Sequence, residues 1–160
     1  MDNEILNDEY FMREALALAK RAAVEDEVPV GAVAVRDGKI IASAHNTRET
    51  TKCATHHAEI LAIERACAAL GGWRLPGVTL YVTMEPCAMC GGAIINARIP
   101  RVVFAAQDLR FGAFGSALDL AKIPLNHTPE VVGGVLGDEA RAMLSEYFRN
   151  KREVAKKTDK

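Results

Sequence analysis

Segments typical of β-strands alternate with helical segments along this chain, and this alternation restricts its fold most strongly. The stretch VGAVAVRDGKIIASAH, residues 30–45, is predicted to form two short strands joined at Asp37-Gly38, a strong hairpin signal. Further strands are predicted at 78–84, 101–106 and 130–136. Strands that alternate with helices predict an α/β fold built in layers.

Apolar residues at helical spacing predict a first helix from about Asp8 to about Glu25, and Pro29 excludes its continuation. The other predicted helical segments are 57–70, 87–98, a turn at 118–123 and a closing helix at 137–153. We find no repeat, linker or low-complexity segment. A single domain is therefore expected over residues 1–160, with its core at about 8–152 and a basic tail at 153–160 that frays.

The composition fits a soluble globular protein, with 49% hydrophobic and 26% charged residues among 160. The acidic start MDNEILNDEYF lacks the features of a signal peptide, and no apolar run approaches the roughly 20 residues of a membrane helix. We therefore expect a cytoplasmic protein without a membrane partner. In that compartment the four cysteines are expected to be free, metal-bound or catalytic rather than disulfide-bonded.

The net charge of −1 does not by itself indicate nucleic-acid binding, which would need a local basic patch. The tail RNKREVAKKTDK, residues 149–160, is the one candidate that we identify for such a patch. On its own, a basic helix end is also what the helix dipole favours, so the tail alone indicates a solvated surface.

The stretch MEPCAMC places Cys87 and Cys90 in a Cys-x-x-Cys spacing. A redox pair, a structural zinc site and a catalytic zinc site could each explain this spacing. A thioredoxin-type pair is expected after the first strand of its unit, whereas this motif follows the third predicted strand. The position of the motif after the third predicted strand therefore favours a metal site over a redox site.

A second motif, THHAEI, adds two adjacent histidines and a carboxylate two positions after His57. Two cysteines and one histidine would give zinc three ligands and leave one position open for water, while Glu59 could serve as an acid and base. Residues two apart cannot both face a metal beside a helix, but they can face one beyond the helix N-terminus. The sequence thus predicts two helix N-termini that converge on one metal.

Both motifs stand in the order and at the separation of the zinc-dependent nucleobase deaminases. Other stretches resemble the bacterial tRNA-specific adenosine deaminases in order and close to their spacing. They are EVPVGAV, HN at 45–46, WRL, TLYVTMEPCAMC, ARIPRVVF, NH at 126–127 and LSEYFR. The resemblance covers residues 10–152, nearly the whole chain.

By this resemblance, the metal ligands are His57, Cys87 and Cys90, with one Zn2+ in each subunit, and Glu59 is the proton shuttle. The implied reaction is hydrolytic deamination of adenosine to inosine at the wobble position of a tRNA anticodon loop. The implied fold is the three-layer α/β/α cytidine-deaminase-like fold with a central mixed five-stranded sheet.

The resemblance also implies how the substrate is bound. Asn46 would contact the target nucleoside, although an asparagine at a strand end is otherwise a common turn residue. The residues expected to bind the substrate are Val28, Pro29, Asn46, Ala58, Pro86, Asp108 and Arg149. The implied partners are a tRNA anticodon stem-loop, whose target base is already unpaired, and a second copy of the chain in a homodimer.

Several residues differ from those usual in this family. His56 replaces a small residue, Ala54 a proline and Ala105 a glycine, and the run LRFGAF after Asp108 is bulkier than usual. These differences flank the expected substrate site rather than the metal ligands.

Two other functions fit parts of the sequence. A deaminase of the same fold could act on a small base or nucleoside, such as guanine or cytosine. Alternatively, Cys53 or His56 could supply a fourth ligand and close a structural zinc site, which the presence of Glu59 argues against. Cys67 lies on an apolar helix face and is expected to be a core residue.

Overall fold

The predicted hairpin is formed by β1 (Gly31–Arg36) and β2 (Lys39–His45), which pair antiparallel. Its turn residues Asp37 and Gly38 have φ angles of 52° and 72°, the positive values that an Asp-Gly turn between two strands needs. The hairpin is seen in a computed structural model that describes residues 2–158 of the chain.

Three more strands complete a mixed sheet: β3 (Val78–Met84), β4 (Arg101–Ala106) and β5 (Glu130–Gly133). The strand order is β2-β1-β3-β4-β5, with β1 antiparallel to β3, and with β4 parallel to both β3 and β5. The predicted mixed five-stranded sheet is therefore confirmed. Its parallel part leaves the ends of β3 and β4 at one edge, where sites of α/β proteins commonly form.

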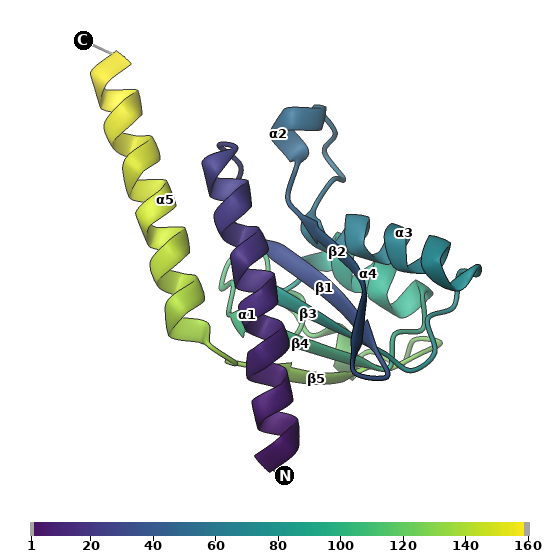
Figure 1. The fold of residues 1–160 in the computed structure, drawn as a ribbon. Coiled ribbons are helices and arrows are strands. Elements are labelled where there is room, and N and C mark those ends of the chain that lie inside the picture. Colours follow the sequence, from purple (N-terminus) through teal and green to yellow (C-terminus); the bar gives the residue numbers. More distant parts are fainter. Residues whose placement is uncertain (1, 159–160) are drawn as a thin grey trace.

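Helices cover both faces of the sheet, so the predicted three-layer α/β/α architecture is also confirmed (Figure 1). α1 (Asp2–Val24) and α5 (Gly137–Thr158) lie on one face. α3 (Ala58–Leu70) and α4 (Ala88–Asn96) lie on the other. Among residues 2–158, none of the helices combines the length and the apolar character that crossing a bilayer requires.

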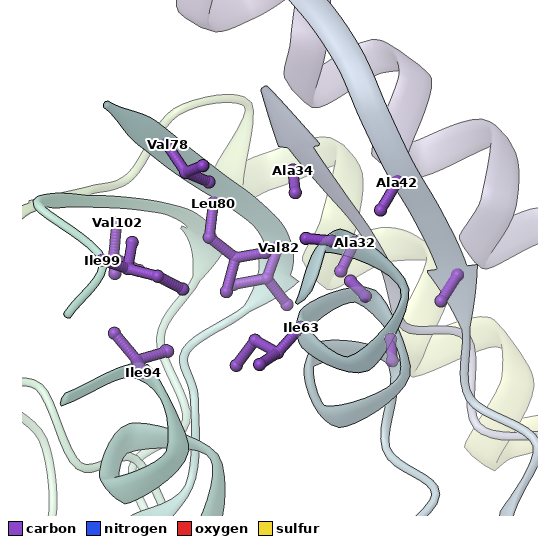
Figure 2. Close-up of a cluster of buried hydrophobic side chains, with 14 of the residues drawn as sticks. Ala32, Ala34, Ala42, Ile63, Val78, Leu80, Val82, Ile94, Ile99 and Val102 are labelled. Carbon is purple, nitrogen blue, oxygen red and sulfur yellow. The ribbon is translucent and has the colours of Figure 1, made fainter. Parts of the chain in front are cut away.

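The core beneath α3 and α4 is built from alternate residues of the strands, because successive side chains in a strand point to opposite faces. Leu80 and Val82 of β3 point toward this core and are fully buried (Figure 2). They lie in one cluster with Ile63 of α3 and Ile94 of α4. Burying each such side chain contributes about 1.5–3 kcal/mol, and this shared core packs α3 and α4 against the same face of the sheet.

The opposite core lies between the sheet and α1 with α5, and it includes Val33 and Val103 from the strands and Met12 from α1. α1 lies very close to β1, since a Cβ atom at Gly31 would overlap the carbonyl oxygen of Ala15. Only glycine fits at this contact, which explains the glycine at the start of β1.

Element boundaries differ from the predictions at several ends. α1 begins at Asp2 instead of about Asp8, because the predicted start rests on the apolar stripe, whose first residue is Phe11. β5 ends at Gly133, because Gly134 and Leu136 have positive φ angles that turn the chain into α5. The predicted helical turn is confirmed as a 3-10 helix, η1 (Leu120–Lys122).

α5 is helical to Thr158 and so continues past the predicted end of the closing helix at residue 153. Residues 159 and 160 of the basic tail lie outside the described residues. The single-domain boundaries and the fraying of the tail stay predictions. One short helix, α2 (Arg48–Thr51), was not predicted.

Candidate metal and active site

Three potential metal ligands meet where α3 and α4 begin. His57 and Cys87 are the residues that precede α3 and α4, and Cys90 lies in the first turn of α4. One ligand atom from each of the three lies within 4.8 Å of the others. Two helix N-termini therefore converge on one point, as the motif spacing predicts.

The separations within this cluster suit a tetrahedral ion. Nδ1 of His57 lies 3.7 Å from Sγ of Cys87 and 3.5 Å from Sγ of Cys90. With Zn–N near 2.05 Å and Zn–S near 2.3 Å, tetrahedral angles separate such atoms by about 3.6 Å. Thiolate and imidazole donors also favour zinc over hard cations such as magnesium. The three residues thus fit zinc in both geometry and donor chemistry.

The environment of Cys87 favours its thiolate form, which is the form that binds a metal. The hydrogen bond from the Cys90 thiol lowers the pKa of Cys87 to about 4, with a further contribution from His57, while burial opposes the shift. The thiolate also lies at the N-terminus of α4, where the helix dipole stabilises negative charge.

Glu59 lies in the first turn of α3 and is buried beside the cluster. Burial raises the pKa of Glu59 to about 7, against smaller opposing effects of a backbone hydrogen bond and of His57. A carboxyl group with a pKa near neutrality can both accept and release a proton at the pH of a cell. Its position and environment suit a general acid and base.

A cavity of about 400 Å³ opens over the cluster, a size common for small-molecule sites. It is lined by Val28, Val30, Asn46, Arg48, His57, Ala58, Glu59, Met84, Glu85, Cys87, Asp108 and Phe111. The cavity therefore joins the cluster and Glu59 to residues from the β2–α3 connection and the loop after β4.

Four residues predicted to bind the substrate line this cavity, namely Val28, Asn46, Ala58 and Asp108. Asn46 is buried, and its Oδ1 accepts a hydrogen bond of 3.0 Å from the backbone N–H of Arg48. Its side chain therefore has the structural role expected of a turn residue while it also faces the cavity.

Pro29, Pro86 and Arg149 are not among the lining residues. Both prolines are buried directly beside lining residues, whereas Arg149 is exposed on α5. The structure thus brings the predicted residues together except at these three positions.

Asp108 lines the cavity and shapes the loop after β4. Its Oδ1 accepts hydrogen bonds of 3.2 Å from the backbone N–H groups of both Arg110 and Phe111. Its own N–H donates to the buried carboxylate of Glu85 at 3.2 Å. Asp108 is therefore part of an ordered turn at the edge of the cavity.

Glu85 anchors this loop and was not predicted from the sequence. Besides Asp108, it accepts hydrogen bonds from the N–H of Phe114 at 3.0 Å, and from the N–H and hydroxyl of Ser116 at 3.2 and 2.5 Å. The only available signal was a carboxylate directly after an apolar strand and before Pro86-Cys87. Arg48, Met84 and Phe111 also line the cavity without having been predicted as site residues.

His56 and Cys53 do not join the metal cluster in the described part of the chain. Nδ1 of His56 lies 2.8 Å from the hydroxyl of Thr51, which itself donates to the carbonyl of Thr47. A hydroxyl has one proton, so His56 is the donor in the first contact. Sγ of Cys53 lies 3.4 Å from the hydroxyl of Thr55. Both residues stabilise the connection around α2.

Comparisons with known proteins identify this arrangement. A sequence model of the MafB19-like deaminases matches residues 6–152. The chain is 51% identical over 150 residues to the tRNA-specific adenosine deaminase of Bacillus subtilis strain 168, and the match covers 93% of each protein.

Solved structures agree with this relationship. One structure comes from biochemical and structural studies of A-to-I editing by tRNA:A34 deaminases at the wobble position of transfer RNA. It matches with a TM-score of 0.82 and 46% identity, and the match covers 84% of this chain and 99% of that one. A guanine deaminase from Nitrosomonas europaea has a TM-score of 0.74 and 30% identity, covering 87% and 83%.

The sequence identity to the tRNA deaminases, 51% and 46%, is thus higher than the 30% to the guanine deaminase. The match to the Bacillus subtilis protein covers 93% of each chain. The His57, Cys87 and Cys90 cluster, the buried Glu59 and the layered fold all agree with it. This chain belongs to the MafB19-like deaminases and, among them, to the tRNA-specific adenosine deaminase family.

Proposed function

We propose that this protein hydrolytically deaminates adenosine to inosine at the wobble position of a tRNA anticodon loop. One observation carries the chemistry: His57, Cys87 and Cys90 converge beside the buried Glu59, and His57, Cys87 and Glu59 line one cavity. The choice of substrate is supported by the relatives that share most of this chain's length.

The proposed cofactor is one Zn2+ in each chain, held by Nδ1 of His57 and the Sγ atoms of Cys87 and Cys90. A zinc ion with these three ligands would keep one open position and would lower the pKa of water there towards neutrality. Because His56 and Cys53 have other partners, a fourth protein ligand is not supplied from this connection. This favours a catalytic over a structural site.

Glu59 is proposed to carry the protons of the reaction. Its carboxylate takes a proton from the attacking water and delivers it to the purine ring nitrogen as the C6–O bond forms. It then takes up the second proton of the water oxygen and delivers it to the amine as the C6–N bond breaks, so the products are inosine and ammonia. Burial excludes bulk water from this exchange and keeps the pKa of Glu59 near 7.

The target base is proposed to enter the cavity between Val28 and Ala58, with Asn46 in contact with the nucleoside and Asp108 beside the flanking nucleotides. Pro29 and Pro86 would support this wall from behind. An anticodon loop presents its bases unpaired, so little stacking energy is lost when one base enters.

The end of α5 is proposed to bind the anticodon stem through its phosphates. It carries Arg149, Lys151, Arg152, Lys156 and Lys157, all exposed. One of them, Lys151, is already engaged with Asp26 at 2.7 Å. Such contacts make binding depend on salt concentration and carry little sequence information.

We also propose a homodimer in the cytoplasm. Exposed apolar side chains on α4 and on the segment after η1 support a subunit contact, namely Met89, Ile123 and Leu125. Gly91 of α4 packs against Leu120, so at least one small residue of this helix serves contacts within the chain. A tRNA substrate and unpaired cysteines support the proposed location.

A substrate panel tests the proposed function. The purified protein is incubated with an anticodon stem-loop containing a wobble adenosine and, separately, with free adenosine, guanine and cytosine. Inosine in the stem-loop, with far slower turnover of the free compounds, is the expected result. Turnover of guanine without inosine in the RNA would instead support the activity of the Nitrosomonas europaea relative.

A further inference from the structure

Phe111 has an unusual position at the mouth of the cavity. Its side chain lines the cavity, yet 67% of the residue is exposed to solvent. Burying a phenylalanine ring stabilises a fold, and this largely exposed ring gains little of that stabilisation within the chain. In residues 2–158 the aromatic contacts involve other rings, so the face of Phe111 is not stacked on an aromatic neighbour.

The backbone that carries Phe111 is held on both sides. The N–H of Phe111 donates to Oδ1 of Asp108, and the N–H of Gly112 donates to the Asp108 carbonyl at 2.8 Å. A Cβ atom at Gly112 would overlap the carboxylate of Glu85, so only glycine allows this approach. The ring is therefore exposed because of where the loop places it and not because the loop is unsupported.

The same loop is tied to the metal-binding segment. Gly112 forms a β-bridge with Cys87, and the N–H of Ala113 donates to the carbonyl of Pro86 at 2.8 Å. The position of Phe111 is thus set relative to Cys87 and to whatever base occupies the cavity. Leu109, two positions earlier, is 77% exposed but does not line the cavity.

From these observations we infer that Phe111 is a binding residue that stacks on the base next to the target adenosine. This inference rests on the proposed function, because it requires a target base inside the cavity and a polynucleotide across its mouth. An exposed aromatic ring at a binding site offers a flat apolar face, and every nucleobase offers a matching one. The RNA would also cover apolar surface that the chain leaves in water.

Kinetics on the anticodon stem-loop test this inference. Stacking on an aromatic residue is worth about 1–3 kcal/mol per base, so Phe111→Ala is expected to raise KM roughly 5- to 150-fold with kcat nearly unchanged. Phe111→Tyr keeps the ring and is expected to restore a KM near the wild-type value. Leu109→Ala is the matched control, and a KM within about twofold of wild type is expected for it.

Two modified stem-loops identify the stacked base. One lacks the base on the 5′ side of the target, and the other lacks the base on the 3′ side. If Phe111 stacks on one of these bases, Phe111→Ala adds no further penalty on the stem-loop that lacks it, as in a double-mutant cycle. An undiminished penalty on both stem-loops would overturn the inference.

The other outcomes are equally decisive. If the wild type forms inosine and Phe111→Ala has the same KM, the stacking role is wrong and the proposed function stands. If the wild type leaves the stem-loop unchanged, both are wrong. Sedimentation of the variants completes the test, because a lower molecular mass for Phe111→Ala alone would assign the ring to a subunit contact and overturn the inference.

Discussion

Nδ1 of His57 lies 3.5 Å from Sγ of Cys90, although 33 positions separate the two residues in the chain. Each residue lies at the N-terminal end of its own helix, and the two helices share one hydrophobic core. Both helices pack on the same face of the sheet through that core, and their N-termini meet beside the metal ligands.

His57→Ala and Cys90→Ala are expected to lose the metal. Each removes one of three ligands, and we expect metal affinity to fall more than about a hundredfold, beyond the effect of losing a residue that only orients a ligand. The neighbouring His56→Ala is the matched control and should keep its metal, because His56 bonds Thr51 instead. Metal content of the purified variants, measured by atomic emission, checks this; metal loss in His56→Ala would contradict the assignment.

Glu59→Gln is expected to keep the metal and lose turnover. Glutamine has nearly the same shape but cannot take up and release the proton, so kcat should fall by about 10²–10⁴-fold. Metal content and thermal midpoint, measured on the same sample, separate this effect from loss of the site. Activity close to wild type would show that Glu59 is not the proton shuttle.

Asp8→Ala is expected to destabilise the fold by about 3–5 kcal/mol. Asp8 is 6% exposed and accepts two hydrogen bonds of 2.8 Å from Arg101 and one of 2.7 Å from Tyr81. Its loss leaves the Arg101 guanidinium with only the exposed Glu130, at 3.6 Å, and removes the acceptor of the Tyr81 hydroxyl. Arg13→Ala is the control: it removes an exposed pair with Glu139, worth about 0–1 kcal/mol. Urea unfolding at pH 7 measures the loss of stability in both variants. An equal loss in Asp8→Ala and Arg13→Ala would contradict the larger effect predicted for Asp8.

The pH dependence of the Asp8 effect has a definite sign. Burial raises the pKa of Asp8, but the hydrogen bonds from Arg101 and Tyr81 outweigh it and hold the pKa below its ordinary value. The stabilisation is thus fully present above the unfolded pKa of about 3.9 and is lost as the pH falls through the lower folded value. The difference in the free energy of unfolding between wild type and Asp8→Ala should therefore be constant from pH 7 to about 5 and become smaller below pH 4. A gap that widens with acid would refute this account.

Glu85→Ala is expected to loosen the loop that carries Asp108 and Phe111. The carboxylate accepts four hydrogen bonds from residues 108–116, and their N–H groups would lose a buried partner. Hydrogen exchange at 108–116 should accelerate, while exchange in β1 stays slow. Ser116→Ala removes only one side-chain bond and should cause a smaller change. Unchanged protection in Glu85→Ala would show that the loop is held by other contacts.

The sequence predicted the fold where local patterns are strong. The hairpin at Asp37-Gly38 follows from the turn preferences of single residues, and α3 ends at Leu70, the last residue of the predicted helical segment. α2 was missed because its four residues are too short a run to show periodicity. The N–H groups of its second and third residues, Glu49 and Thr50, donate to Glu27, more than 20 positions earlier. Local sequence does not contain such a partner.

The candidate site shows the same division. The spacing of His57 to Glu59 and of Cys87 to Cys90 predicted a cluster at two helix N-termini, because helix geometry determines how such residues can point. Glu85 and Phe111 reach the cavity only because the loop after β4 folds back onto Pro86 and Cys87. This contact joins segments that lie far apart in the sequence, so it could be found only in the structure.

The most direct test is sequencing of inosine, which is read as guanosine, in an anticodon stem-loop that carries one adenosine at the wobble position and a second adenosine elsewhere in the loop. The protein should convert the wobble adenosine, leave the second one intact, and contain about one zinc per chain in the same sample. Conversion of neither adenosine by the zinc-loaded protein, or equal conversion of both, would contradict the central claim.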